Sequence, residues 1–176
     1  YPGRDAMKAR LTAGGVEWRE MMPIDLLRGQ WRRPDLRNHR KLMVVDGEIG
    51  FCGSHNLIQT SYGSRKNVEI GRHWLDLSMQ VRGDAVVQLA IVFLTDWLTE
   101  TGEVLDLSSH IIDQPDVRPG GASNAFQLVP SGPGFPTEPN LRMFTALVHQ
   151  ARERVAITSP YFVPDESLLA AITSAA

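Results

Sequence analysis

Hydrophobic residues recur along this 176-residue chain with two spacings, one typical of helices and one of strands. Helical spacing or helix-forming composition predicts helices over residues 4–13, 85–98, 140–151 and from 166 onward. Alternation, or a short apolar run bounded by turn residues, predicts strands over residues 16–22, 38–45, 48–52, 76–81 and 155–159, and a strand followed by a turn over residues 125–132. A polar loop is expected over residues 59–67. Because strands and helices alternate, we expect an α/β layered fold.

Two of these elements carry more detailed predictions. The helix over residues 85–98 should bury one face, formed by Val86, Leu89, Ala90, Phe93 and Trp97. Residues 38–52 should form a β-hairpin, because the dipeptide Asp46-Gly47 between two apolar runs is preferred in two-residue hairpin turns. In such a turn Val45 pairs with Glu48, and the face carrying Leu42 and Val44 packs into the core.

The predicted hairpin gathers four polar residues on its other face. Counting outward from the turn, Lys41 lies opposite Cys52 and His39 lies opposite Ser54. Period-two alternation adds Asn56 to the same face if the pairing extends that far. A shift of one residue in the register would reverse both faces. The expected cluster therefore depends on the turn having two residues.

These side chains suit the chemistry of a phosphate ester. The imidazole of His39 can attack phosphorus or protonate a leaving oxygen near neutral pH. The ammonium of Lys41 can neutralise non-bridging oxygens, and Ser54 and Asn56 can add hydrogen bonds. Gly53 would let the backbone approach a ligand closely. Because neither a carboxylate cluster nor a second histidine at ligand spacing accompanies the set, we expect no metal and no cofactor.

Composition narrows the classes of partner. The net charge is −2 and the isoelectric point is about 6.2, whereas a nucleic-acid binder more often has a basic excess. Nucleic acid is therefore not an expected partner. The most apolar stretch, residues 85–94, is shorter than the roughly 20 residues that span a membrane. The single cysteine, Cys52, excludes an internal disulfide and is expected to be a buried structural thiol.

A local basic cluster stands out in this mildly acidic chain. It consists of Arg28, Arg32, Arg33, Arg37 and Arg40. Such a cluster is commonly a solvated surface, and beside a lipid site it could instead bind anionic headgroups or a membrane surface. The sequence leaves both interpretations open.

The stretch HRKLMVVDGEIGFCGSHN, residues 39–56, resembles the HKD motif of the phospholipase D superfamily, H-x-K-x4-D followed by G-S-x-N. The matching positions are His39, Lys41, Asp46, Gly53, Ser54 and Asn56. Further stretches resemble bacterial cardiolipin synthases, namely LTAGGVEWREMMP, GRHWLDLSMQVRGDAV, FLTDWLTETG, LVPSGP and VAITSPYFVPD. The resemblance covers nearly the whole chain.

The resemblance implies a phospholipase D-like mixed sheet flanked by helices. It also implies a phosphatidyltransferase that joins two phosphatidylglycerol molecules through a covalent phosphatidyl-histidine and releases glycerol. His39 would be the nucleophile or the acid, Lys41 would act with it, and Asp46, although part of the catalytic motif, is expected in the turn and not at phosphorus. The expected location is the cytoplasmic face of the cell membrane. A lipid hydrolase, or an incomplete fragment that only binds anionic phospholipid, remains the alternative.

The sequence departs from the family in having no second H-x-K motif. The other histidines are followed two positions later by apolar residues, Leu57, Leu75, Ile112 and Ala151. We therefore expect an internal fragment, truncated at both ends, whose missing C-terminal half carries the second motif. Residues 1–113 would be the C-terminal part of a first domain, residues 114–124 a linker, and residues 125–176 the start of a second domain.

Overall fold

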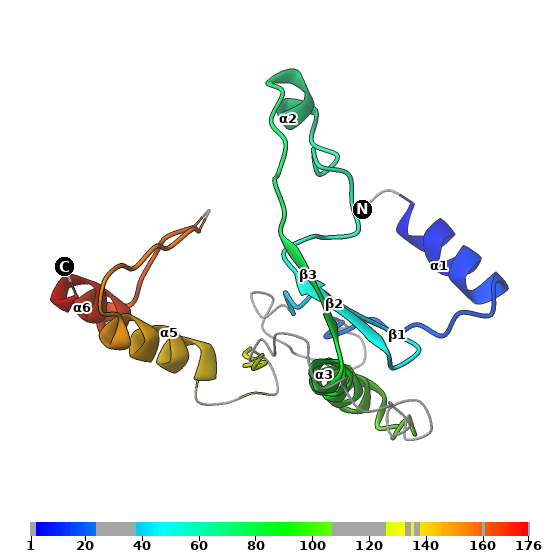
Figure 1. Ribbon diagram of the computed structural model, residues 1–176. Coiled ribbons are helices and arrows are strands. Elements are labelled where there is room, and N and C mark those ends of the chain that lie inside the picture. Colours follow the sequence, from blue (N-terminus) through cyan, green and yellow to red (C-terminus); the bar gives the residue numbers. More distant parts are fainter. Residues whose placement is uncertain are drawn as a thin grey trace. The chain divides into compact units, whose positions relative to one another are not determined.

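The computed structural model describes residues 3–23, 38–106, 126–132, 135, 138–159 and 161–175. The chain divides into two compact units, Tyr1–Phe126 and Gln127–Ala176, whose elements are labelled in Figure 1. The linker predicted over residues 114–124 lies outside the described residues. No helix in the described part of the chain is both long enough and apolar enough to span a membrane.

The first unit is built on a three-stranded antiparallel sheet in the order β1-β2-β3. The strands are β1 (Leu42–Val45), β2 (Ile49–Gly53) and β3 (Ser78–Arg82). Among the residues that the structure describes, the helices of this unit are α1 (Arg4–Ala13), α2 (Arg65–Glu69) and α3 (Asp84–Thr101). Helix α3 contacts all three strands, and Figure 1 shows it beside their lower ends. The predicted α/β class is confirmed.

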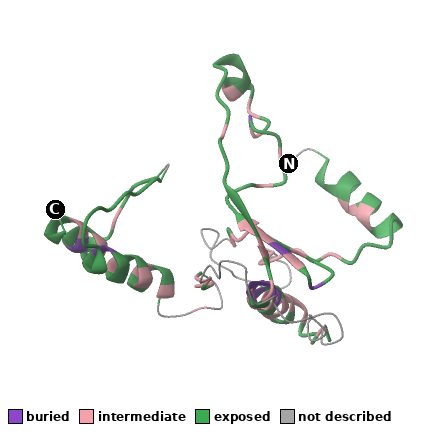
Figure 2. Cartoon of the chain, in the orientation of Figure 1, coloured by how far each residue is buried: buried purple, intermediate pink, exposed green. Residues whose placement is uncertain are grey.

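The core of this unit lies between α3 and the sheet. The buried residues of α3 are Ala85, Val86, Leu89, Ala90 and Val92. This buried stripe lies in the first half of the helix, where Figure 2 shows purple. A Cβ atom at Gly50 would lie 2.5 Å from Leu89 Cδ1, so β2 needs glycine where the helix approaches it. The predicted buried face is correct for its first three members, but Phe93 is 40% exposed.

The hairpin turn forms at Asp46-Gly47, as predicted, but the register differs from the prediction by one residue. Both turn residues have positive φ, 52° and 68°, and the N–H of Glu48 donates to the carbonyl of Val45 over 3.0 Å. Val45 nevertheless pairs with Ile49 and not with Glu48. Glu48 is therefore an extra, unpaired residue of the loop, as in a β-bulge.

Helices were predicted more accurately than isolated strands. Helix α1 has the predicted bounds, and α5 (Pro139–Gln150) and α6 (Glu166–Ser174) lie close to theirs. The strands predicted over residues 16–22 and 155–159 are wrong, because both segments are irregular. Within residues 126–132, a single bridge from Gly132 to Phe135 replaces a strand. None of these segments finds a neighbouring strand in the described parts of the chain, and a lone strand is not stable.

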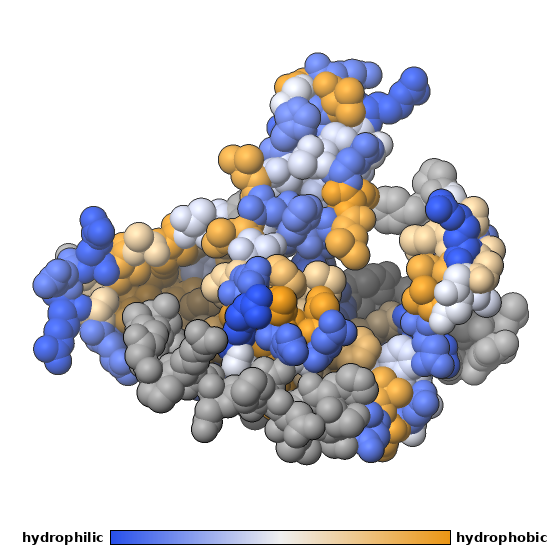
Figure 3. All heavy atoms as spheres, turned by 45° about the vertical axis from the view of Figure 1, so that its right-hand side comes forward, coloured by the Kyte–Doolittle hydropathy of each residue, from blue (hydrophilic) through white to orange (hydrophobic). Residues whose placement is uncertain are grey.

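The segment between β2 and β3 extends away from the sheet in Figure 1. The predicted polar loop contains the start of α2, whose N-cap residue Ser64 accepts a hydrogen bond from the backbone N–H of Asn67 over 3.3 Å. Of residues 54–77, only Ser61 is buried, and Leu57, Leu75 and Leu77 are largely exposed. Figure 3 shows apolar areas between the polar ones on the surface of the molecule. This segment therefore adds little to the core.

The second unit pairs α5 with α6, and Val148 and Ala171 are buried in it. Asp165 caps α6 by accepting the N–H of Leu168 over 2.8 Å. An apolar groove of about 610 Å³ is lined by both helices and by the segment between them. In that segment Val155 and Ile157 are 41% and 49% exposed, so this unit presents substantial apolar surface.

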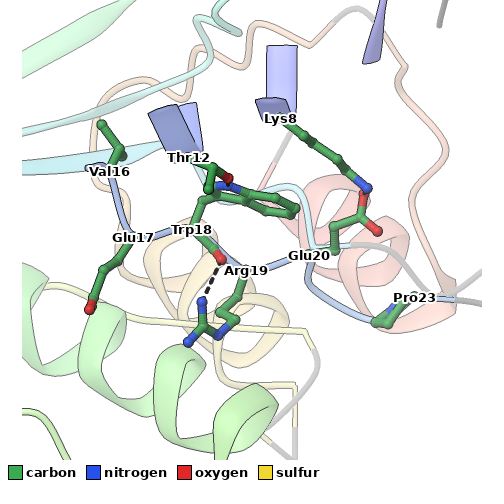
Figure 4. Close-up of a pocket in the computed structure, with 8 residues that line it drawn as sticks. All are labelled: Lys8, Thr12, Val16, Glu17, Trp18, Arg19, Glu20 and Pro23. Atoms are coloured by element: carbon green, nitrogen blue, oxygen red, sulfur yellow. Dashed lines mark hydrogen bonds and ion pairs between the residues drawn. The ribbon is translucent and has the colours of Figure 1, made fainter. Parts of the chain in front are cut away.

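Helix α1 is held to the segment that follows it by a cluster of charges beside a pocket of about 500 Å³ (Figure 4). Lys8 Nζ lies 2.6 Å from Glu20 Oε1, and Arg4 also pairs with Glu20. Lys8 lies 5.2 Å from the centre of the Trp18 ring, and the Trp18 N–H donates to Thr12 Oγ1 over 3.0 Å. The hydrogen bonds from Lys8 and Arg4 lower the pKa of Glu20 below its usual 4.5.

A Glu20→Gln variant should test how α1 is held. Because the folded-state pKa of Glu20 is depressed, its contribution to stability is present above pH 4.5 and is lost as the pH falls through the lower folded-state value. Unfolding by urea should show the variant to be less stable at pH 7 by less than about 1 kcal/mol, the range for solvent-screened pairs. The difference should vanish near pH 2. Glu17→Gln, in the same exposed segment, is the matched control, and an equal difference at both pH values would contradict this account.

Candidate catalytic site

His39 and Lys41 lie in a segment that leads into the sheet without being part of it. Strand β1 begins at Leu42, and the Gly53 N–H extends the pairing by one residue through a 3.3 Å bond to the Lys41 carbonyl. The His39 side chain is exposed and that of Lys41 is half-buried. Lys41 Nζ donates to the His39 carbonyl over 2.6 Å, which holds the ammonium beside the residue that carries the imidazole.

The four-residue face predicted for the hairpin needs correction. In the observed register Lys41 lies opposite Gly53, and Cys52 lies opposite Leu42. Cys52 therefore shares a face with Leu42 and not with Lys41, because the extra loop residue shifts every opposing pair by one. Strand β2 ends at Gly53, so alternation no longer determines the direction of Ser54. Ser54 is not the cross-strand partner of His39.

Ser54 joins the end of β2 to the segment just before β3. Its hydroxyl donates to Asp76 Oδ1 over 2.8 Å and accepts the N–H of Leu77 over 3.0 Å. Its own N–H donates to the Leu77 carbonyl over 2.9 Å. The hydroxyl proton is therefore already engaged, and binding a phosphoryl oxygen would require it to exchange this partner.

Asn56 is engaged in a second local contact. Its carboxamide donates to the hydroxyl of Tyr62 over 2.7 Å, and the Tyr62 ring lies 5.7 Å from the ring of Trp74. Among the described residues, the hydrogen bonds of Ser54 and Asn56 do not reach His39 or Lys41. The structure thus brings together the first two residues of the predicted site and places the other two in separate contacts.

The two remaining motif positions have structural roles here. Asp46 lies in the hairpin turn with φ of 52°, as expected from the sequence. A Cβ atom at Gly53 would lie 2.2 Å from the Leu77 carbonyl oxygen and 2.6 Å from Ser78 Cα. Gly53 therefore lets the start of β3 and the residue before it approach β2 closely, and its predicted role in admitting a ligand stays a prediction.

The sequence interpretation missed Asp96, which lies in α3. Asp96 Oδ2 accepts hydrogen bonds from Arg40 Nε over 3.1 Å and from Asn38 Nδ2 over 3.0 Å. Arg40 Nη2 also pairs with Asp96 Oδ1, which makes the ion pair bidentate. Asp96 follows Leu89 and Val92 at helical spacing, and a carboxylate on a buried stripe requires a partner. That pattern was the signal available in the sequence.

Arg40 is consequently not a member of a free basic surface, as the cluster interpretation allowed. Its side chain is 15% exposed and neutralised by Asp96. The other four arginines of that cluster lie outside the described residues. Burial raises the pKa of the half-buried Cys52 thiol, so it stays neutral and is a poor nucleophile at neutral pH. In the parts of the chain that the structure describes, no three His, Cys, Asp or Glu side chains gather as metal ligands would.

Comparison with curated proteins finds similarity to cardiolipin synthase A of several bacteria along nearly the whole chain. The chain is 35% identical over 172 residues to cardiolipin synthase A of Proteus mirabilis (strain HI4320), which covers 96% of this chain and 34% of that protein. It is 34% identical to cardiolipin synthase A of Serratia proteamaculans (strain 568), over 100% of this chain and 34% of that protein. For cardiolipin synthase A of Edwardsiella ictaluri (strain 93-146), the identity is 34%, over 98% of this chain and 35% of that protein.

These matches confirm the resemblance to bacterial cardiolipin synthases that the sequence motifs indicated. The chain spans about a third of the length of the curated relatives it matches. No family model matches the chain, and no solved structure matches it.

Proposed function

We propose that this chain is part of a phosphatidyltransferase of the cardiolipin synthase type. The observation that carries the proposal is the similarity to cardiolipin synthase A proteins over 96% or more of the chain, with the HKD-like residues 39–56 inside the matched region. Its substrates would be anionic phospholipids, phosphatidylglycerol in particular. The protein would therefore act at a membrane, at its cytoplasmic face by family resemblance.

In the proposed reaction an imidazole nitrogen attacks the phosphorus of one phosphatidylglycerol. The bond from phosphorus to the glycerol oxygen breaks, and a general acid protonates the departing glycerol. A hydroxyl of a second phosphatidylglycerol then loses its proton to that group, now a base, and attacks the phosphorus, which frees the imidazole. His39 supplies either the nucleophile or the acid. The second histidine would come from another HKD motif in the whole protein.

Lys41 is suited to stabilise the charge that develops on the phosphoryl oxygens. Its ammonium lies 2.6 Å from the carbonyl oxygen of His39, so a phosphoryl group attacked by His39 would be close to a cation. Ser54 and Asn56 would contribute only after leaving their present partners, Asp76 and Tyr62. They are proposed phosphate ligands of the substrate-bound state.

The proposal is tested by product analysis with the full-length protein and phosphatidylglycerol vesicles. We expect cardiolipin and free glycerol in equal amounts, and a chelator should leave the rate unchanged because the proposed steps use no metal ion. Phosphatidic acid in place of cardiolipin would establish a lipid hydrolase, in which water replaces the second lipid. Binding of the vesicles without any product would contradict the enzymatic assignment, as would inhibition by chelator that a divalent cation reverses.

A further inference from the structure

We infer that Asp96 is a positioning residue, which holds the segment that carries His39 in the orientation needed for the reaction. The inference rests on the proposed function, in which the His39 imidazole either takes up the phosphatidyl group or transfers its proton. It adds to that function a residue from outside the HKD-like stretch, 57 positions along the chain from His39 and on a different element.

The sheet alone does not fix the position of His39. The last pairing contact on this side of β1 is the one at the Lys41 carbonyl, so residues 38–40 lie beyond the hydrogen-bonded ladder. What holds them is a set of side-chain contacts. Both neighbours of His39, Asn38 and Arg40, are bound to the carboxylate of Asp96. His39 is thus flanked on each side by a residue tied to one anchor.

These contacts form a closed ring of hydrogen bonds among Asn38, Arg40 and Asp96, and the backbone of His39 is part of that ring. Asn38 Oδ1 accepts the backbone N–H of Arg40 over 2.8 Å, while Asn38 Nδ2 donates to Asp96 Oδ2 over 3.0 Å. The Arg40 guanidinium engages both oxygens of the same carboxylate. The backbone at His39 is bracketed by these bonds, and its side chain remains exposed and accessible to a substrate.

The anchor itself belongs to the best-packed element of the unit. Helix α3 contacts all three strands and contains the buried stripe that ends near Val92, one turn before Asp96. The Arg40 and Asp96 side chains are 15% and 18% exposed, so water screens this bidentate pair only partly. Through the Asp96 carboxylate, the packed helix therefore restrains residues 38–40, which the hydrogen bonds of the sheet do not reach.

The expected consequence is a loss of turnover without a matching loss of substrate binding. A displacement of about 1 Å in a reacting group can cost roughly 100-fold in rate. Asp96→Asn keeps the size of the side chain and removes its charge, so we expect kcat to fall by about this factor. KM should change little, because the Asp96 carboxylate is occupied by Asn38 and Arg40.

The experiment compares kcat and KM of the full-length protein and its variants in the cardiolipin assay. Thermal unfolding gives the folded fraction of each, and kcat is calculated per folded molecule. Asp84→Asn is the matched control, since it removes a carboxylate from the first turn of the same helix and should leave kcat unchanged. Arg40→Lys keeps the positive charge but lacks the planar fork, so it should give a smaller fall in kcat. If Asp96→Asn does not fold, the kcat of Arg40→Lys tests the positioning role instead. The double variant Arg40→Gln/Asp96→Asn should have a kcat no lower than that of the more impaired single variant, Arg40→Gln or Asp96→Asn. Both substitutions break the same set of contacts, so their effects on kcat should not add.

The outcomes separate this inference from the function on which it rests. If His39→Ala is inactive while Asp96→Asn and Arg40→Lys have normal kcat per folded molecule, the positioning role is overturned and the proposed function stands. A fall in stability without a fall in kcat likewise overturns the positioning role alone. If His39→Ala retains full transfer, both the positioning role and the proposed function are overturned.

Discussion

Replacing His39 by alanine is expected to abolish phosphatidyl transfer by the full-length protein while leaving it folded. The imidazole would be lost either as the nucleophile or as the group that protonates the leaving oxygen. Loss of a general acid or base alone costs roughly 10²- to 10⁴-fold in rate, and loss of a nucleophile costs at least as much. Because the His39 side chain is exposed, removing it should cost little stability.

The measurement is cardiolipin formation from phosphatidylglycerol, with the unfolding midpoint of each variant recorded alongside. His149→Ala, at an exposed position of α5 outside the HKD-like stretch, is the control and should retain its activity. Lys41→Ala should also be severely impaired, because the phosphoryl charge would lose its nearby ammonium, an effect comparable to the roughly 10²- to 10³-fold cost of an oxyanion donor. Normal transfer by His39→Ala would remove this histidine from the reaction.

The hairpin shows where local sequence information is sufficient and where it is not. The dipeptide Asp46-Gly47 determined the turn, because positive φ at two successive residues is a local preference that these residue types satisfy. The register was not determined by that dipeptide. It depends on whether Glu48 pairs or is left unpaired, which the turn dipeptide does not specify. Strand β2 also pairs with β3 and contacts α3, both of which come later in the sequence.

The same distinction separates helices from strands elsewhere in the chain. Helices α1, α5 and α6 were predictable because their hydrogen bonds join residues four apart, so composition and caps such as Asp165 are informative. The segment 155–159 has a strand-like sequence but is exposed and irregular. A strand forms only with a partner, and no pattern within five residues can specify one.

The candidate site was predictable in its residue types and only partly in its geometry. The spacing of His39 and Lys41 placed them together, as the structure also shows. The places of Ser54 and Asn56 depended on extending strand alternation past Gly53, where the strand in fact ends. The role of Asp96 requires knowing that α3 lies beside residues 38–40, which is a property of the tertiary structure.

The substitution with the largest expected effect on stability is Gly53→Ala. A methyl group at this position would lie 2.2 Å from the Leu77 carbonyl oxygen and 2.6 Å from Ser78 Cα, both of them backbone atoms that cannot turn aside as a side chain can. Relief requires β2 and β3 to separate where Ser54 N–H bonds to the Leu77 carbonyl. We expect the free energy of unfolding to fall by at least about 3 kcal/mol, which is at or beyond the upper end of the usual cost of adding a methyl group to a well-packed site.

Urea unfolding of the same protein, with the Gly14→Ala variant as control, measures this loss. Gly14 ends α1 with φ of −82°, and a methyl group there would meet nothing closer than 3.4 Å. That control should change stability by less than about 1 kcal/mol, and it could be slightly stabilising because alanine restricts the unfolded chain more than glycine does. The Gly53→Ala variant should also expose the Ser54 region to hydrogen exchange, since the bonds to Asp76 and Leu77 would break with the strand contact. If the two variants proved equally stable, the close approach of β3 to Gly53 could not be a feature of the folded protein. The glycine would then be free to serve the ligand contact that the motif first suggested.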